Sequence, residues 1–263
     1  MATLVAKALA LAQSGPHLPQ RVFNKLHTWM DRFSAPCGIQ NVRRASELDT
    51  CLGLLGLPFE PYFESESLLA FESALAGKQR HLVNCSPPFG AFHNGTITLG
   101  RLCYAVSRAL RPRVVVETGV AYGVTSAYIL QALAENGEGE LHSVDLPPLG
   151  RDAAEYVGFL VSSELRRRWN LHTGPARKLL PGILREVGRI DAFVHDSLHT
   201  YAHMKWEFQA ALSAMRDGGI LIADDIEGNR AFEETFEDPR AASWFALKEY
   251  NKEAICGAMR LRA

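Results

Sequence analysis

The feature that most constrains the fold is an alternation of short apolar runs and helical patterns that begins near residue 96. The apolar runs are rich in β-branched side chains and end at glycine or polar residues, which is typical of buried strands. They are RVVVETG, GELHSVDLPP, NLHTG, IDAFVHD and GGILIADDI. The helical patterns between them are VTSAYILQALAEN, DAAEYVGFLVSSELRRRW, ARKLLPGILREV and HMKWEFQAALSAMR. This alternation predicts an α/β fold with right-handed crossovers and a parallel sheet covered by helices on both faces.

The two ends of the chain have a different texture. The first 95 residues contain short helical patterns broken by prolines and no convincing strand, with capped helices expected at ASELDTCLGLLGL and ESESLLAFESALAGK. The tail, SWFALKEYNKEAICGAMRLRA, predicts an antiparallel hairpin at the sheet edge that turns around Asn251 and Lys252. We therefore expect an N-terminal helical extension at 1–95, which covers the site or pairs subunits, and a main domain at 96–263.

Composition excludes several classes of protein. The chain has 263 residues and a formal charge of −1, so no basic excess indicates nucleic-acid binding. No apolar run approaches the roughly 20 residues that cross a bilayer.

The N-terminal MATLVAKALALAQSGPHLPQ is interpreted as an amphipathic helix, because Lys7 interrupts the apolar stretch instead of preceding it as in a signal peptide. Five scattered cysteines without a C-x-x-C pair favour reduced thiols in a cytoplasmic protein.

The first strand ends in a glycine-containing turn. Ligands of open α/β sheets bind beyond the carboxyl ends of the strands. Here Glu117 is followed by Gly119 and Gly123, and a helix opens at Thr125-Ser126. Glycines allow a tight turn and a close approach to a ligand, and a helix N-terminus offers free N–H groups to an anion. The spacing matches neither the standard dinucleotide fingerprint nor a phosphate-binding loop.

The second strand ends at Asp145, 26 residues after Gly119. An acid at this place can accept hydrogen bonds from ribose hydroxyls, as in nucleotide-binding βαβ units. A glycine turn followed by a solvated aspartate is the alternative.

The fourth strand ends at Asp196 and the fifth at Asp224 and Asp225. If these strands are neighbours, their ends lie about 5 Å apart and three carboxylates meet at one rim. Such acids repel one another unless a cation neutralises them, and oxygen ligands favour Mg²⁺ over zinc. The alternative is that one or two of these acids cap the following helices.

The stretch VHDSLHTYAH places histidines at 195, 199 and 203. Read as a helix, HDSLH approaches the H-E-x-x-H pattern of a zinc hydrolase. Read as a strand end, His195 and Asp196 point to opposite faces. We favour the strand, with His195 as a buried packing residue and His203 on the next helix.

In this order and spacing the motifs VVVETGVAYGVTS, HSVDLP, HTGPARKLLP, IDAFVHDSLHTY and LSAMRDGGILIADDI resemble those of class I S-adenosylmethionine-dependent methyltransferases. The resemblance covers about residues 96–263 and implies their Rossmann-like sheet and their cofactor. Glu117, Gly119, Gly123 and Thr125 would surround the methionine part, Asp145 the ribose, and the segment at 174–176 the adenine. The cofactor-binding residues predicted in this way are Glu117, Gly119, Gly123, Thr125, Ser126, Asp145, Gly174, Ala176 and Asp196.

Within this class the chain is most similar to divalent-metal-dependent O-methyltransferases of the catechol type and the macrocin-type sugar enzymes. The resemblance implies Asp196, Asp224 and Asp225 as ligands of Mg²⁺ or another divalent cation, and His199 as the general base. The catechol type carries Lys at the base position and Asn as the third ligand, so His199 and Asp225 favour the sugar-modifying branch. A neutral imidazole can take a hydroxyl proton near pH 7.

The expected function is methyl transfer from S-adenosylmethionine to a hydroxyl of a small molecule such as a sugar, a catechol or another diol. The alternatives are a metal-independent N- or C-methyltransferase and a non-catalytic cofactor-binding domain of the same fold. The expected partners are a small-molecule substrate and a second copy of the chain in a homodimer or higher homo-oligomer, with no nucleic acid and no membrane.

Overall fold

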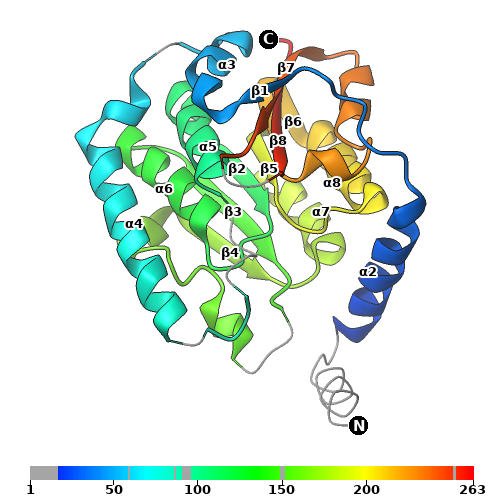
Figure 1. The fold of residues 1–263 in the computed structure, drawn as a ribbon, viewed down its shortest axis with the longest axis horizontal. Coiled ribbons are helices and arrows are strands. Elements are labelled where there is room, and N and C mark those ends of the chain that lie inside the picture. Colours follow the sequence, from blue (N-terminus) through cyan, green and yellow to red (C-terminus); the bar gives the residue numbers. More distant parts are fainter. Residues whose placement is uncertain (1–16, 59, 86, 91–95, 149–151, 251–252) are drawn as a thin grey trace.

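The computed structural model describes residues 17–58, 60–85, 87–90, 96–148, 152–250 and 253–263. Its centre is an eight-stranded sheet with the strand order β1-β7-β8-β6-β5-β2-β3-β4 (Figure 1). Only β8 is antiparallel to its neighbours β6 and β7, and the other described pairs are parallel. The strands are β1 Val42–Arg44, β2 Val114–Thr118, β3 Glu140–Asp145, β4 Trp169–Thr173, β5 Ile190–His195, β6 Met215–Ala223, β7 Ala241–Lys248 and β8 Ile255–Leu261. The predicted α/β class, with a parallel sheet and an antiparallel C-terminal hairpin, is confirmed.

Helices cover both faces of this sheet because successive strand residues point to opposite sides. On β2, Val115 packs into the core under α5 and α6, while Val116 packs into the core under α7 and α8. The helices are α2 Leu18–Met30, α3 Leu48–Leu54, α4 Glu66–Asn84, α5 Ile97–Leu110, α6 Val124–Asn136, α7 Ala176–Val187 and α8 Tyr201–Ala214. The nearly continuous apolar runs of the central strands therefore serve two cores.

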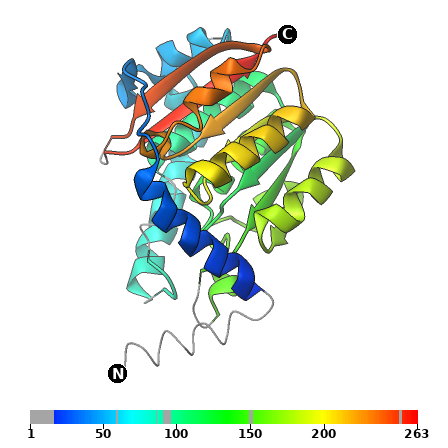
Figure 2. The same cartoon turned by 90° about the vertical axis from the view of Figure 1, so that its right-hand side faces the viewer.

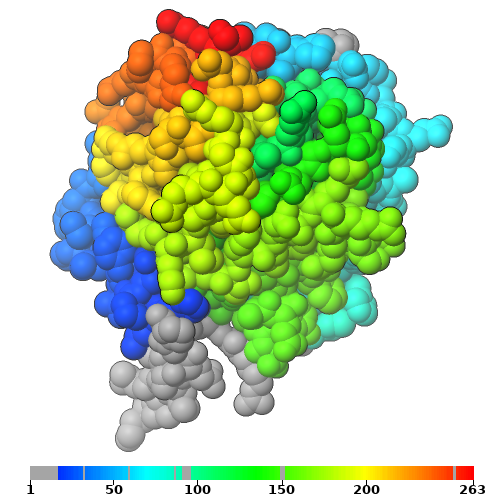
Figure 3. Space-filling view, turned by 180° about the vertical axis from the view of Figure 1, so that it is seen from behind, coloured from blue at the N-terminus to red at the C-terminus, as the bar shows by residue number. Residues whose placement is uncertain are grey.

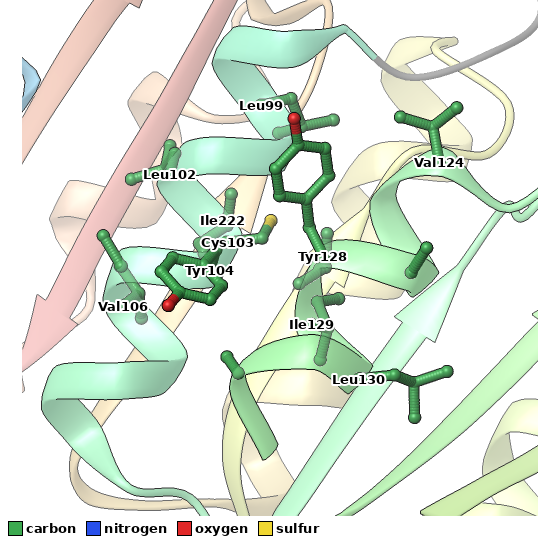
Figure 4. Close-up of a cluster of buried hydrophobic side chains, with 14 of the residues drawn as sticks. Leu99, Leu102, Cys103, Tyr104, Val106, Val124, Tyr128, Ile129, Leu130 and Ile222 are labelled. Atoms are coloured by element: carbon green, nitrogen blue, oxygen red, sulfur yellow. The ribbon is translucent and has the colours of Figure 1, made fainter. Parts of the chain in front are cut away.

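The helices α5 and α6 pack against each other in the first core (Figure 4). Gly100 of α5 lies so close to Tyr128 of α6 that a Cβ at this position would be 2.4 Å from the tyrosine Cδ2. Thr96 caps α5 by accepting a hydrogen bond from the Leu99 amide. This packing fixes α6, whose first turn follows the glycine-containing turn at the end of β2.

One predicted helix is wrong. DAAEYVGFLVSSELRRRW contains only two short 3-10 turns, Ala153–Tyr156 and Leu165–Arg168. The Gly158 amide donates to the Ala121 carbonyl, and the Leu160 amide donates to the Tyr122 carbonyl, both at 2.9 Å. These tertiary bonds replace the helical ones and tie the segment to the turn after β2.

Three smaller predictions also need correction. The N-terminal extension is not purely helical, because β1 joins the sheet beside β7. As a result the C-terminal hairpin is not the sheet edge. The helix α4 continues past Gly77 to Asn84 instead of ending at the glycine. The N-terminal stretch at 1–16 and the hairpin turn at 251–252 lie outside the described residues.

The helix α2 runs along the outside of the main domain, next to α7 (Figures 1, 2 and 3). Three contacts attach this part of the chain. The Arg21 guanidinium donates to the Pro147 carbonyl at 2.6 Å, and the Arg177 guanidinium lies 5.2 Å from the Phe23 ring. Asp31, just after α2, accepts a hydrogen bond from the first amide of α8. The segment thus bridges the loop after β3 and the starts of α7 and α8.

Candidate functional site

A cavity of about 420 Å³ opens at the carboxyl ends of β2, β3, β5 and β6. Residues that follow these four strands line it together with three polar residues of α2. The lining residues are Gln20, Arg21, Asn24, Gly119, Val120, Ala121, Val144, Asp145, Leu146, Pro148, Pro175, Ala176, Asp196, Ser197, Leu198, His199, His203, Asp224 and Asp225. The cavity therefore lies at the edge of the sheet where the residues at the strand ends were expected to meet.

The turn after β2 needs glycine at two positions. Gly119 and Gly123 have φ angles of +87° and +89°, in the left-handed region that favours glycine. A Cβ on Gly119 would lie 1.8 Å from the Asp196 carbonyl oxygen, and one on Gly123 would lie 2.8 Å from Gly158 Cα. Gly119 is therefore where the loops after β2 and β5 touch.

Asp145 holds this turn from the end of β3. Its Oδ1 accepts hydrogen bonds from the Val120 amide at 3.0 Å and the Ala121 amide at 3.5 Å. Its Oδ2 is buried and makes no hydrogen bond within the described part of the chain. Burial raises the pKa of Asp145, against those amide bonds and the positive charge of Arg21. The residue is thus a structural acceptor with one further oxygen beside the cavity.

Glu117 lies behind the cavity and does not line it. Its Oε2 accepts hydrogen bonds from the hydroxyls of Ser126 at 2.6 Å and Ser143 at 2.7 Å. Burial raises the pKa of Glu117 to about 7, although the two serine hydrogen bonds oppose the shift. In this geometry Glu117 and Ser126 support the loop from inside.

The other predicted cofactor residues also divide into those that line the cavity and those that lie behind it. Ala176 lines the cavity, whereas Gly123, Thr125 and Gly174 do not. Thr125 and Gly123 lie at the start of α6, and Gly174 has a φ of +152° beside Leu179. These three residues shape the walls from behind.

The acids predicted after β5 and β6 come together. These two strands are neighbours, with His195 opposite Ala223, so Asp196 and Asp224 follow at adjacent places. The Asp224 amide donates to the His195 carbonyl at 2.9 Å. Burial, followed by the charges of Asp224, Glu117 and Asp225, raises the pKa of Asp196 well above its ordinary value. Negative charge is therefore concentrated at this rim.

His199 lies between two of these acids. Its Nδ1 is 3.0 Å from Asp225 Oδ2, and its Nε2 is 3.7 Å from Asp196 Oδ1. Burial lowers the pKa of His199, but the hydrogen bond to Asp225 and the charges of Asp225 and Asp224 outweigh it and raise the pKa overall. The imidazole is thus held by Nδ1, with Nε2 directed towards the Asp196 side.

The donor set suits a hard cation in its chemistry, since the three carboxylates that follow β5 and β6 line one cavity and Asp196 is strongly disfavoured as an anion. Within the described ranges, however, no group of three or more His, Cys, Asp or Glu side chains is arranged so as to hold a metal ion. The ligand type therefore fits Mg²⁺, whereas the side-chain positions are not those of an assembled site.

The other two histidines of the motif belong to a buried network. His195 ends β5, and its Nδ1 lies 2.6 Å from Glu207 Oε2. His203, on α8, lies 2.9 Å from Glu207 Oε1. The prediction that His195 is buried in a strand and His203 lies on the next helix is confirmed, and the zinc-helix reading of HDSLH fails.

Sequence reasoning missed four of the residues at or behind the cavity: Gln20, Arg21, Asn24 and Glu207. The α2 residues share one polar helix face, but nothing in their spacing indicates which distant surface they meet. Glu207 had one local signal, its i, i+4 spacing from His203. No described helix is long and apolar enough to span a membrane, in line with the absence of a long apolar run.

Part of the chain is similar to a known protein family. Residues 116–226 match the family model described as a methyltransferase domain. No curated protein matches the chain by sequence.

Solved structures share the fold at low identity. The O-methyltransferase TomG of Streptomyces achromogenes, in complex with S-adenosylmethionine, is 17% identical with a TM-score of 0.56, over 82% of this chain and 96% of that one. The Bacillus cereus O-methyltransferase, in complex with S-adenosylhomocysteine, is 16% identical with a TM-score of 0.53, over 81% and 96%. The methyltransferase PaMTH1 of Podospora anserina, bound to S-adenosylhomocysteine, is 15% identical with a TM-score of 0.54, over 79% and 98%.

Proposed function

We propose that this chain, which carries a class I S-adenosylmethionine-dependent methyltransferase domain, transfers a methyl group to a hydroxyl of a small molecule with the help of Mg²⁺. The observation that carries the proposal is the composition of one cavity. Gly119, Asp145 and Ala176 line it together with the acid cluster and His199. Some of the predicted cofactor residues therefore line the same cavity as the predicted chemical residues.

The cofactor side of the cavity would bind S-adenosylmethionine through the turn after β2 and through Asp145. The second oxygen of Asp145 is the acceptor that a ribose hydroxyl would need. Arg21 and its neighbours on α2 lie over this side and would exclude water from the bound cofactor. The helix α2 would therefore act as part of the cofactor site.

The acceptor side would deprotonate the hydroxyl. His199 would take the proton at Nε2, because Asp225 holds Nδ1 and so orients the ring. Asp196, Asp224 and Asp225 would hold Mg²⁺. When bound, Mg²⁺ lowers the pKa of the acceptor hydroxyl and S-adenosylmethionine supplies the methyl group.

A second candidate is metal-independent methyl transfer, in which the His199–Asp225 pair acts without a cation. The 3.0 Å contact between these side chains favours it, since it already resembles a base with its orienting acid. The two candidates differ in their response to chelation.

The test is methyl transfer from radiolabelled S-adenosylmethionine to a panel of catechols and sugar diols, with Mg²⁺ or with excess EDTA. We expect methylation of at least one hydroxyl acceptor. This product should be lost in excess EDTA and should return when Mg²⁺ is added. Full turnover in EDTA would replace the proposal by the metal-independent candidate. Methylation only of nitrogen or carbon acceptors would contradict O-methylation.

A further inference from the structure

Glu207 is a carboxylate on α8 with no exposed side-chain surface, and the mechanism above does not use it. It lies at the centre of four contacts. Thr118 Oγ1 donates to it at 2.6 Å and Ser197 Oγ at 3.2 Å, while nitrogens of His195 and His203 lie at 2.6 Å and 2.9 Å. A buried carboxylate without such partners would be costly, so these groups act as one unit.

The contacts join the elements that build the cavity. Thr118 is the last residue of β2 and directly precedes Gly119. His195 is the last residue of β5, and Ser197 begins the loop that leads to His199. Glu207 therefore connects the ends of the two strands that carry the cofactor turn and the acid rim.

The two partners on the β5 side flank Asp196 in the chain. His195 is the last strand residue, and the Asp196 amide continues the strand pairing by donating to the Thr118 carbonyl, so the side chains of His195 and Asp196 point to opposite sides. Glu207 contacts the residues on both sides of Asp196, and Asp196 itself lines the cavity. The His195 ring also meets the His199 ring edge-on, with centroids 5.3 Å apart.

From this geometry we propose that Glu207 is a positioning residue, which holds Asp196 in the direction required to bind the cofactor. The proposal rests on the proposed function and on the cofactor contact of Asp196 that the resemblance to S-adenosylmethionine-dependent methyltransferases implies. A purely structural carboxylate would also stabilise the fold, so the two cases differ in whether the effect of Glu207 passes through Asp196.

A double-mutant cycle on cofactor affinity separates these cases. The full chain and the variants Glu207→Gln, Asp196→Asn and the double variant are titrated calorimetrically with S-adenosylhomocysteine. Glutamine keeps the size of the side chain but loses one acceptor oxygen. We expect each single change to weaken binding about 10-fold and the double variant to be weakened little further, because both changes disrupt one interaction.

Two further variants serve as controls for this cycle. Glu234→Gln removes a carboxylate that also contacts α8, through Tyr201 and Lys205, but lies outside the cavity, and it should leave affinity within about 2-fold. Ser197→Ala removes one donor to Glu207 while keeping the carboxylate, and should weaken binding about 3-fold. This variant takes the place of Glu207→Gln if that protein does not fold.

Thermal unfolding is measured alongside. Unchanged affinity in Glu207→Gln, or losses of the two single variants that multiply in the double variant, would overturn the positioning role. Unchanged affinity in Asp196→Asn would remove Asp196 from the cofactor site, and the positioning role with it. If only the proposed chemistry is wrong, no methyl transfer is measured, while the double-mutant cycle still gives the expected affinities for S-adenosylhomocysteine.

Discussion

The two halves of the cavity differ in the groups that they present. In the half built by β2 and β3, the turn is fixed by glycines with positive φ and by amide bonds to Asp145. In the half built by β5 and β6, Asp196, Asp224 and Asp225 lie beside one another, and burial, followed by the charges of its neighbours, raises the pKa of Asp196.

From this difference we infer that the two halves of the cavity have different roles. A preorganised half suits a ligand that is the same in every reaction cycle, because ordering its site at each binding event would cost affinity. A half with concentrated negative charge suits a cation or a proton that arrives with the reaction. Changes in the first half should alter cofactor affinity. In the second half, changes at Asp224 and His199 should alter turnover, whereas Asp196, next to the first half, should also affect cofactor affinity.

The largest expected effect lies where the halves touch. Gly119→Ala places a Cβ 1.8 Å from the Asp196 carbonyl and forces a positive φ on alanine. We expect binding of S-adenosylhomocysteine to be lost and stability to fall by about 3 kcal/mol or more. Gly188→Ala is the control, since Gly188 also has a positive φ but an added Cβ would meet nothing within 4 Å, so it should cost about 1 kcal/mol. Equal costs in chemical denaturation would contradict the close approach.

The next effect should be confined to the acid half. Asp224→Asn keeps the size of the side chain but removes its charge, so Mg²⁺-dependent turnover should fall at least about 10²-fold while cofactor affinity changes little. Asp217→Asn, an exposed change at the other end of β6, should leave turnover intact. The measurement is the Mg²⁺ dependence of methyl transfer. A full rate with an unchanged Mg²⁺ response would exclude Asp224 as a ligand.

His199→Ala should reduce turnover by about 10²-fold, because the hydroxyl loses its proton acceptor. Cofactor affinity should stay within about 3-fold, since the base belongs to the acid half. His81→Ala, which removes an exposed histidine of α4, is the control. Calorimetry and initial rates are measured on the same preparations, and wild-type turnover would remove His199 as the base.

The smallest effect on turnover is expected at Glu117, behind the first half. Its pKa is raised by burial to about 7, so the folded state binds a proton more tightly than the unfolded state. The resulting stabilisation is present below the unfolded pKa and is lost as the pH rises through about 7. From pH 5 to pH 8 this group should cost the wild type roughly 2 kcal/mol of unfolding free energy.

Glu117→Gln should flatten that dependence, because glutamine mimics the protonated acid at every pH. Urea unfolding of both proteins at several pH values measures the difference. Parallel stability curves would show that the carboxyl titrates normally.

The positions of the acids at the strand ends could be predicted from the sequence. Asp145 is the last residue of its strand, and Asp196 and Asp224 each directly follow one, and parallel strands bring such residues to one edge of the sheet. The pairing of β5 with β6 was the single assumption needed to gather the acids, and it is correct.

Features that depend on distant contacts could not be predicted in this way. The segment around Gly158 has helical periodicity but forms backbone bonds with the turn after β2 instead. The strand β1 has only three residues, and its pairing with β7 defines it. Glu207 lies on a helix where a glutamate usually faces solvent, and only the fold shows that its partners surround it. The approach of α2 to Asp145 is likewise non-local.

The most direct test of the division between the halves is a crystal structure with S-adenosylhomocysteine and Mg²⁺. We expect the cofactor to lie over Gly119 with its ribose at Asp145. We expect a metal ion to be bound by Asp196, Asp224 and Asp225 next to His199. A structure in which the cofactor is bound, the His199–Asp225 contact persists and no metal lies among the acids at saturating Mg²⁺ would contradict this expectation.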